Sequence, residues 1–158
     1  MQESDLRAPV GSDAWMELAL DEARRSARWG DVPVGAIVVD ASGVVIGRGG
    51  NQRELTKDPT AHAEVVALRA AASARGDWHL GGCTLVVTLE PCILCAGAIL
   101  AARIERVVFG AWDEKAGASG SVHDLLRDRR HNHVVEVYQG VRAVEGERLL
   151  VDFFAERR

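Results

Sequence analysis

The stretch TLVVTLEPCILCAGAILAA, residues 84–102, changes character at Pro91. Residues 84–89 before it are threonine, valine and leucine, which predicts a buried strand. Pro91 suits the first turn of a helix because it has no backbone N–H to leave unpaired. The apolar run of residues 92–102 predicts that helix. The stretch therefore predicts a strand that leads directly into a helix.

The same two kinds of element alternate along the rest of the chain. Apolar runs predict further strands at residues 34–39, 44–47, 106–109 and 134–138. Apolar stripes predict further helices at residues 13–29, 60–74, 122–127 and 147–156. Ser12 or Asp13 is expected to cap the first helix, and residues 51–58 are expected to form a polar loop. The alternation predicts an α/β fold with a partly parallel sheet covered by helices.

Length and composition fit one domain. The chain has 158 residues, of which 47% are hydrophobic, so we expect a single domain over residues 12–158 after a disordered segment of residues 1–11. The longest apolar run, residues 92–102, is shorter than the roughly 20 residues that a bilayer requires, so no membrane helix is expected. Three cysteines, two of them spaced C-x-x-C, favour metal or redox chemistry in a reducing compartment, and we expect a cytoplasmic protein.

The net charge of −4 argues against a broadly basic surface for nucleic acid. One basic cluster nevertheless lies late in the chain, and it comprises Arg127, Arg129, Arg130, His131 and His133. Asp124 and Asp128 interleave with these residues. We therefore interpret the cluster as a solvated loop rather than as a phosphate-binding patch.

Four residues with ligand or proton-transfer chemistry follow a metal-binding pattern: His62, Glu64, Cys92 and Cys95. One His and two Cys form a zinc set that is one ligand short of four, which is the arrangement of catalytic zinc. Zinc at such a site lowers the pKa of water toward about 7, and Glu64 is available to handle the proton. Cys92 and Cys95 lie about one turn apart at a helix start, where the helix dipole favours thiolate.

This spacing predicts two helix N-termini that converge on one metal ion, at the edge of the sheet where open α/β folds bind ligands. His62 is expected in the first turn of its helix. On an ideal helix, however, the side chains of His62 and Glu64 would point about 200° apart. Either the turn is irregular or the metal lies beyond the helix end.

Two other interpretations of the cysteine pair stay open. A structural zinc site would need a fourth ligand, and the candidates are Cys83, His79, His131 and His133. A thioredoxin-like redox pair is the second alternative. Catalytic zinc is favoured because structural sites usually close with four protein ligands. Cys83 begins an apolar strand and is more simply explained as a buried small hydrophobe.

With Glu64 included, the pattern H-A-E followed by P-C-x-x-C resembles the zinc-dependent nucleoside and nucleobase deaminases. Longer stretches resemble the bacterial tRNA adenosine deaminase family in particular. They are VPVGA at 32–36, DPTAHAE at 58–64, TLEPC at 88–92, CAGA at 95–98, RVVFG at 106–110 and DFF at 152–154. They follow the family's order, and the resemblance covers nearly the whole chain from about residue 13. Leu94 departs from the family, which usually has Met there, and we expect a change of packing without loss of chemistry.

The resemblance implies a three-layer α/β/α fold of the cytidine deaminase-like type, with a central five-stranded mixed sheet. It implies hydrolytic deamination of adenosine to inosine at the wobble position of a tRNA anticodon stem-loop. The family is a homodimer, so two subunits with one Zn²⁺ each are expected. By the same resemblance, His62, Cys92 and Cys95 hold the zinc, Glu64 shuttles the proton, and Asn51 hydrogen-bonds the purine.

Further expectations from the resemblance concern the walls of the site. The pocket would be lined by Pro33, Val34 and Ala63. The anticodon loop would be contacted by Asp113, Lys115, Asn132 and Phe153, although a core role for Phe153 is equally expected. Two alternative functions remain: a deaminase of a free base or nucleoside such as guanine or cytosine, and a non-catalytic RNA-binding module stabilised by zinc.

Overall fold

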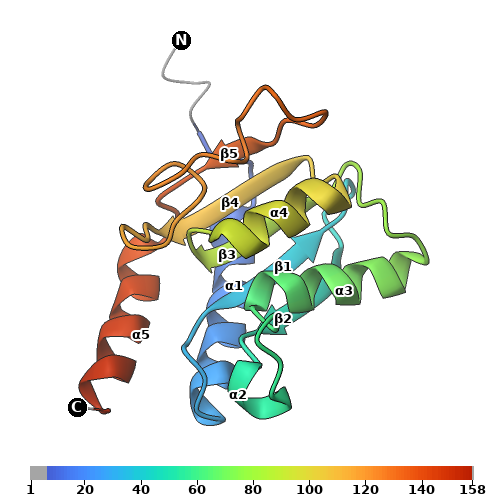
Figure 1. Ribbon diagram of the computed structural model, residues 1–158. Helices are drawn as coiled ribbons and strands as arrows, with labels where there is room; N and C mark the ends of the chain where they lie inside the picture. The colour runs from blue at the N-terminus through green and yellow to red at the C-terminus, as the bar shows by residue number, and fades with distance from the viewer. Residues whose placement is uncertain (1–6, 158) are drawn as a thin grey trace.

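A five-stranded sheet forms the middle layer of the computed structural model, which describes residues 7–157 (Figure 1). Its strands are β1 (Gly35–Val39), β2 (Val45–Gly50), β3 (Thr84–Leu89), β4 (Arg106–Ala111) and β5 (Glu136–Tyr138). They lie in the order β2-β1-β3-β4-β5. β1 pairs antiparallel with β2 and β3, whereas β4 pairs parallel with β3 and β5. The sheet is therefore mixed, as predicted.

Helices cover both faces of this sheet. They are α1 (Ser12–Arg28), α2 (Arg53–Thr56), α3 (Ala63–Arg75), α4 (Ile93–Ala102) and α5 (Ala143–Ala155). α3 and α4 lie together in front of the sheet in Figure 1, and α1 lies behind it. Along β3, Leu85 and Val87 pack in the core on the α3–α4 side, whereas Val86 packs with Met16 and Leu20 of α1. The predicted three-layer α/β/α architecture is confirmed.

Glycines let the helices approach the β1–β2 hairpin closely. A Cβ at Gly35 would lie 2.0 Å from the carbonyl oxygen of Ala19 in α1. On the other face, a Cβ at Gly47 would lie 2.4 Å from the carbonyl oxygen of Ala67 in α3. No side chain fits in either place, so these two glycines set the distance of α1 and α3 from the sheet.

The polar loop predicted at residues 51–58 contains the short helix α2, which was not predicted. The carboxylate of Asp31 accepts the backbone N–H groups of Glu54 and Leu55, at 3.1 and 3.3 Å. Asp31 thereby caps α2 from a distant part of the chain. Because this cap is not a neighbour in sequence, no local pattern could have revealed it.

The prediction of a helix at residues 122–127 is wrong. There the backbone N–H groups of His123 and Leu125 donate to the carbonyl oxygens of Gly117 and Ala118. The segment thus pairs with the loop before it instead of forming a helix. At the ends of other elements the differences are smaller: Gly11 rather than Ser12 or Asp13 is the N-cap of α1, α5 begins at Ala143, and β5 is shorter than predicted.

None of the helices within residues 7–157 combines the length and the apolarity needed to cross a bilayer. The disordered segment predicted for residues 1–11 lies mostly outside the described residues, so it stays a prediction.

Candidate metal centre and active site

Both helices that carry the metal-binding pattern begin at the same edge of the sheet. β1 runs antiparallel to β2 and to β3, so β2 and β3 run in the same direction and end at the same edge. α3 follows β2 after the short helix α2, and α4 follows β3 directly. The predicted convergence of two helix N-termini is therefore confirmed, at the edge where such sheets bind ligands.

His62 and Cys92 were predicted to lie in the first turns of their helices. They are instead the N-cap residues of α3 and α4. Their backbones are extended, with φ and ψ of −68° and 152° for His62 and −80° and −177° for Cys92. Cys95 lies within the first turn of α4. Because α3 begins only at Ala63, the ideal-helix angle that would separate His62 from Glu64 does not apply.

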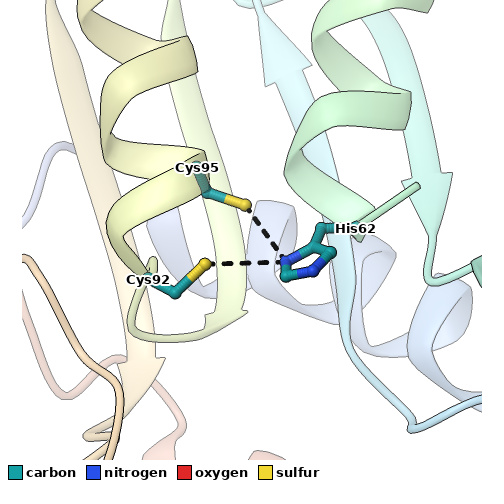
Figure 2. Close-up of side chains that lie close together, drawn as sticks. All are labelled: His62, Cys92 and Cys95. Carbon is teal, nitrogen blue, oxygen red and sulfur yellow. Dashed lines mark hydrogen bonds between the residues drawn. The ribbon is translucent and has the colours of Figure 1, made fainter. Parts of the chain in front are cut away.

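The three candidate ligands face one another across the space between the two helix starts (Figure 2). The Nδ1 atom of His62 lies 3.6 Å from the Sγ atom of Cys92 and 3.5 Å from that of Cys95. Bonds of about 2.0 Å from zinc to nitrogen and about 2.3 Å to sulfur, at a tetrahedral angle, place the two donors about 3.5 Å apart. The observed spacing therefore fits zinc.

Within residues 7–157, no fourth His, Cys, Asp or Glu side chain joins this group, whose ligand atoms lie within 4.8 Å of one another. Three of the residues considered as a fourth ligand have other partners. Cys83 is buried beside the guanidinium group of Arg75. His79 accepts the N–H of Gly81, and Nε2 of His133 lies 2.6 Å from the carbonyl oxygen of Ile104. Three protein donors are the arrangement of a catalytic zinc site.

Hydrogen bonds within the cluster shift the pKa values of all three side chains. A hydrogen bond from the Cys95 thiol, aided by His62 and by the N–H of Cys95, lowers the pKa of Cys92 to about 3. The pKa of the Cys95 thiol is raised because it donates to Cys92 and is buried. The hydrogen bond with Cys92 likewise raises the pKa of His62. Cys92 is thus a thiolate ready for a cation, and Cys95 releases its proton when a metal binds.

Glu64 lies beside this cluster with its side chain almost entirely buried, at 4% exposure. Burial raises the pKa of its carboxyl group to about 7, against the opposing effect of a hydrogen bond from its own N–H. A carboxyl group with a pKa near neutrality can both take and give a proton at physiological pH. Three metal donors and a buried carboxyl group thus lie side by side.

Comparison with known proteins supports the same interpretation. Residues 11–111 match the family model of the cytidine and deoxycytidylate deaminase zinc-binding region. The chain is 44% identical over 146 residues to the tRNA-specific adenosine deaminase of Bacillus subtilis (strain 168), covering 92% of this chain and 90% of the relative. The chain belongs to the tRNA-specific adenosine deaminase family. Since the family model is that of a zinc-binding region and the donor set fits zinc, the cofactor is one Zn²⁺ per chain.

Two further comparisons concern a solved structure and a longer protein. A solved structure from work on A-to-I editing by tRNA:A34 deaminases at the wobble position of transfer RNA is 43% identical, with a TM-score of 0.83, and the match covers 87% of this chain and 99% of that one. A protein of Deinococcus deserti named tRNA(Ile)-lysidine synthase is 50% identical over 157 residues, which are 96% of this chain but only 29% of that protein. A domain like this family member therefore also occurs inside a longer chain.

In this member of the tRNA-specific adenosine deaminase family, Asn51 ties the end of β2 to the start of α3. Its Oδ1 atom accepts the N–H of Ala63 at 2.8 Å, and its Nδ2 atom donates to the carbonyl oxygen of Val32 at 3.0 Å. The indole N–H of Trp29 donates to the carbonyl oxygen of Asn51 at 2.8 Å. The amide of Asn51 retains one N–H and one lone pair for a ligand. Pro33, Val34 and Ala63 are buried next to this junction.

Two cavities lie beside the end of β3 and beside Asn51, and Val32 lines both. The larger has a volume of about 680 Å³ and is lined by Val32, Leu89, residues 111–116, and Ala143, Glu147, Leu150 and Phe154 of α5. The smaller, of about 470 Å³, is lined by Asn51, Phe153, Arg157 and residues 29–32, 53 and 54. None of His62, Glu64, Cys92 and Cys95 lines either cavity, and α5 contributes residues to both.

The residues predicted to contact RNA do not all line the same cavity. Asp113 and Lys115 line the larger cavity. Phe153 lines the smaller one but is only 7% exposed, with the guanidinium carbon of Arg157 at 3.4 Å from its ring centre. Asn132 is exposed in the segment between β4 and β5 and lines neither. Leu89 and Phe154 also line the larger cavity and had not been predicted as site residues, although they lie within the stretches TLEPC and DFF.

Proposed function

We propose that this protein hydrolyses adenosine to inosine at the wobble position of a tRNA anticodon and releases ammonia. The observation that supports the proposal most directly is the three-donor cluster of His62, Cys92 and Cys95 beside the buried Glu64, in a chain that belongs to the tRNA-specific adenosine deaminase family. A metal donor set alone could be structural. Its combination with a proton carrier is what a hydrolytic enzyme needs.

His62, through Nδ1, and Cys92 and Cys95, through their sulfur atoms, would hold the zinc ion. Zinc, when bound, lowers the pKa of water from about 16 to about 7 and so supplies a nucleophile near neutral pH. The N-terminal ends of α3 and α4 contribute their partial positive charge at the same place. This charge favours the thiolate form of Cys92 and Cys95 on which metal binding depends.

Glu64 would act as the proton carrier in two successive steps. As the oxygen of water bonds to C6 of adenine, the carboxylate accepts the water proton and passes it to N1 of the ring. As the bond from C6 to the amino nitrogen breaks, the same group delivers the remaining hydroxyl proton to the leaving ammonia. Burial disfavours the charged form of this carboxyl group and raises its pKa, which favours its protonation between the two steps.

Recognition of the base would depend on the residues around the cluster. Asn51 has an N–H and a lone pair left for the purine, and Pro33, Val34 and Ala63 would form the apolar wall. Asp113 and Lys115, which line the larger cavity, would contact the nucleotides that flank the base, and so would Asn132 and Phe153. An unpaired loop base suits such a site because it is extruded more easily than a base in a duplex.

The experiment that tests this proposal offers the zinc-loaded protein four substrates: an anticodon stem-loop with a wobble adenosine, free adenosine, guanine and cytidine. We expect ammonia release only with the stem-loop, and sequencing should read inosine at the wobble position. Release with guanine or cytidine instead would identify a deaminase of free bases or nucleosides. Binding of the stem-loop without any ammonia would identify a non-catalytic RNA-binding module.

We also infer that the enzyme is a cytoplasmic homodimer in which residues 12–158 act as one domain. Two observations support association of two copies: Trp78 and Ile93 are 64% and 56% exposed, and a largely apolar cavity of about 360 Å³ lies between α3 and α4. Large exposed apolar surfaces favour protein contacts. Free cysteines that serve as metal ligands suit the reducing cytoplasm. Sedimentation equilibrium tests the homodimer directly, since the mass of a monomer would contradict it.

A further inference from the structure

Glu90 is buried at the end of β3, with an exposure of 2%. Its carboxylate accepts four hydrogen bonds from the loop that follows β4, residues 113–121. Oε1 accepts the N–H of Asp113 at 3.0 Å. Oε2 accepts the N–H of Ser119 at 3.0 Å and the N–H of Ser121 at 3.1 Å. The hydroxyl of Ser121 shares its one proton between Oε2, at 2.9 Å, and the carbonyl oxygen of Asp113, at 2.7 Å. Three of the four donors are backbone groups of one loop.

No Lys, Arg or His side chain among residues 7–157 forms an ion pair with this carboxylate. A buried carboxylate without a cation is tolerated only when hydrogen bonds replace its lost hydration. Backbone N–H groups arranged around an anion do this. The loop and the carboxylate therefore depend on each other. The N–H groups of the loop replace water around Glu90, and the carboxylate holds these N–H groups in position.

The same loop also bonds to the turn that carries the first cysteine. The N–H of Ala118 donates to the carbonyl oxygen of Pro91 at 2.8 Å, and Gly117 forms an antiparallel bridge with Cys92. A Cβ at Gly117 would lie 2.3 Å from the carboxyl carbon of Glu90, so only glycine permits this contact. The loop therefore lies directly on the backbone at the start of the metal-binding helix.

The first half of the loop, residues 113–116, borders the larger cavity together with Val32, Leu89 and α5. We propose that Glu90 is a positioning residue, which fixes this loop relative to Cys92 so that the cavity keeps the shape in which the RNA substrate binds. This inference rests on the proposed function for the identity of the substrate. The positioning of the loop by Glu90 does not depend on which substrate is bound.

The test compares Glu90→Gln with Glu105→Gln in the zinc-loaded protein. Both variants replace a carboxylate by an amide of the same size, but Glu105 is exposed on the turn before β4. In Glu90→Gln an amide N–H₂ group faces backbone N–H groups, so we expect amide hydrogen exchange at Asp113, Ser119 and Ser121 to accelerate about tenfold or more. Exchange in β1 and β3 should not change.

The kinetic readout uses the stem-loop substrate. For Glu90→Gln we expect KM to rise about tenfold, kcat to change less than about threefold and zinc content to stay at one ion per chain, because the loop shapes the binding cavity and contains no metal ligand. Glu105→Gln should match the wild type in all three. Ser121→Ala, which removes one of the four donors, should give a smaller rise in KM and serves if Glu90→Gln does not fold.

Three outcomes would overturn the proposal. Unchanged exchange at the three loop amides would show that Glu90 does not hold the loop. Faster exchange with an unchanged KM would show that the held loop does not serve the substrate. Faster exchange in β1 and β3 as well would show a general loss of stability. If the wild type itself does not deaminate the stem-loop, the proposed function fails and the substrate part falls with it, while the exchange data still decide whether Glu90 holds the loop.

Discussion

Replacing Glu64 by glutamine keeps the size of the side chain and removes its ability to ionise, so this variant separates folding from catalysis. In the metal-free protein, burial raises the pKa of Glu64 from the ordinary 4.5 to about 7. At about 1.4 kcal/mol for each pH unit, the difference corresponds to about 3 kcal/mol. The charge that the enzyme needs at neutral pH is thus one that the fold disfavours.

The sign of the pH effect follows from linkage. Because the pKa of Glu64 is higher in the folded state, the stability that the neutral group provides is fully present below pH 4.5 and is lost as pH rises through about 7. Glutamine does not ionise. The free energy of unfolding of Glu64→Gln should therefore equal that of the wild type near pH 4.5 and exceed it by up to about 3 kcal/mol at pH 8.

The assay is urea denaturation of both proteins at several pH values after removal of metal by a chelator, with Glu105→Gln as the matched control. In the zinc-loaded state, Glu64→Gln should bind one zinc ion and lose turnover by about 100-fold or more, the usual contribution of a general acid–base group. A stability difference that does not grow between pH 4.5 and pH 8 would refute the burial argument. Full activity of the variant would refute the proton-carrier role.

Four other substitutions test separate parts of the structure. Cys92→Ala should reduce bound zinc, measured by elemental analysis, to well below one ion per chain, because two donors hold zinc poorly. Gly35→Ala should lower the free energy of unfolding by about 3 kcal/mol, since its Cβ would meet the backbone of α1 at 2.0 Å. Asn51→Ala should lower it by about 1–3 kcal/mol by leaving the N–H of Ala63 unpaired. Leu94→Met should change stability by less than about 0.5 kcal/mol and leave turnover unchanged, because Leu94 is 40% exposed.

The chemistry of the site could be predicted from the sequence because it depends on residue types and short spacings. His62, Cys92 and Cys95 are the donors that zinc prefers, and the change from a β-branched run to a helix at Pro91 placed two of them at a helix start. The strand at residues 84–89 was predicted with its observed bounds. These features are local, so neighbouring residues in the sequence determine them.

Burial and long-range hydrogen bonds were decided only by the tertiary structure. Asp31 caps α2 across 23 residues, and Glu90 binds Ser121 across 31; neither contact leaves a periodic signal. The short helix at residues 53–56 was missed for this reason, and the helix predicted at 122–127 failed because that segment pairs with the preceding loop. The raised pKa of Glu64 has the same origin, since other elements enclose the carboxyl group. A sequence names the groups that can react, whereas only the folded chain determines how far each of them is removed from water.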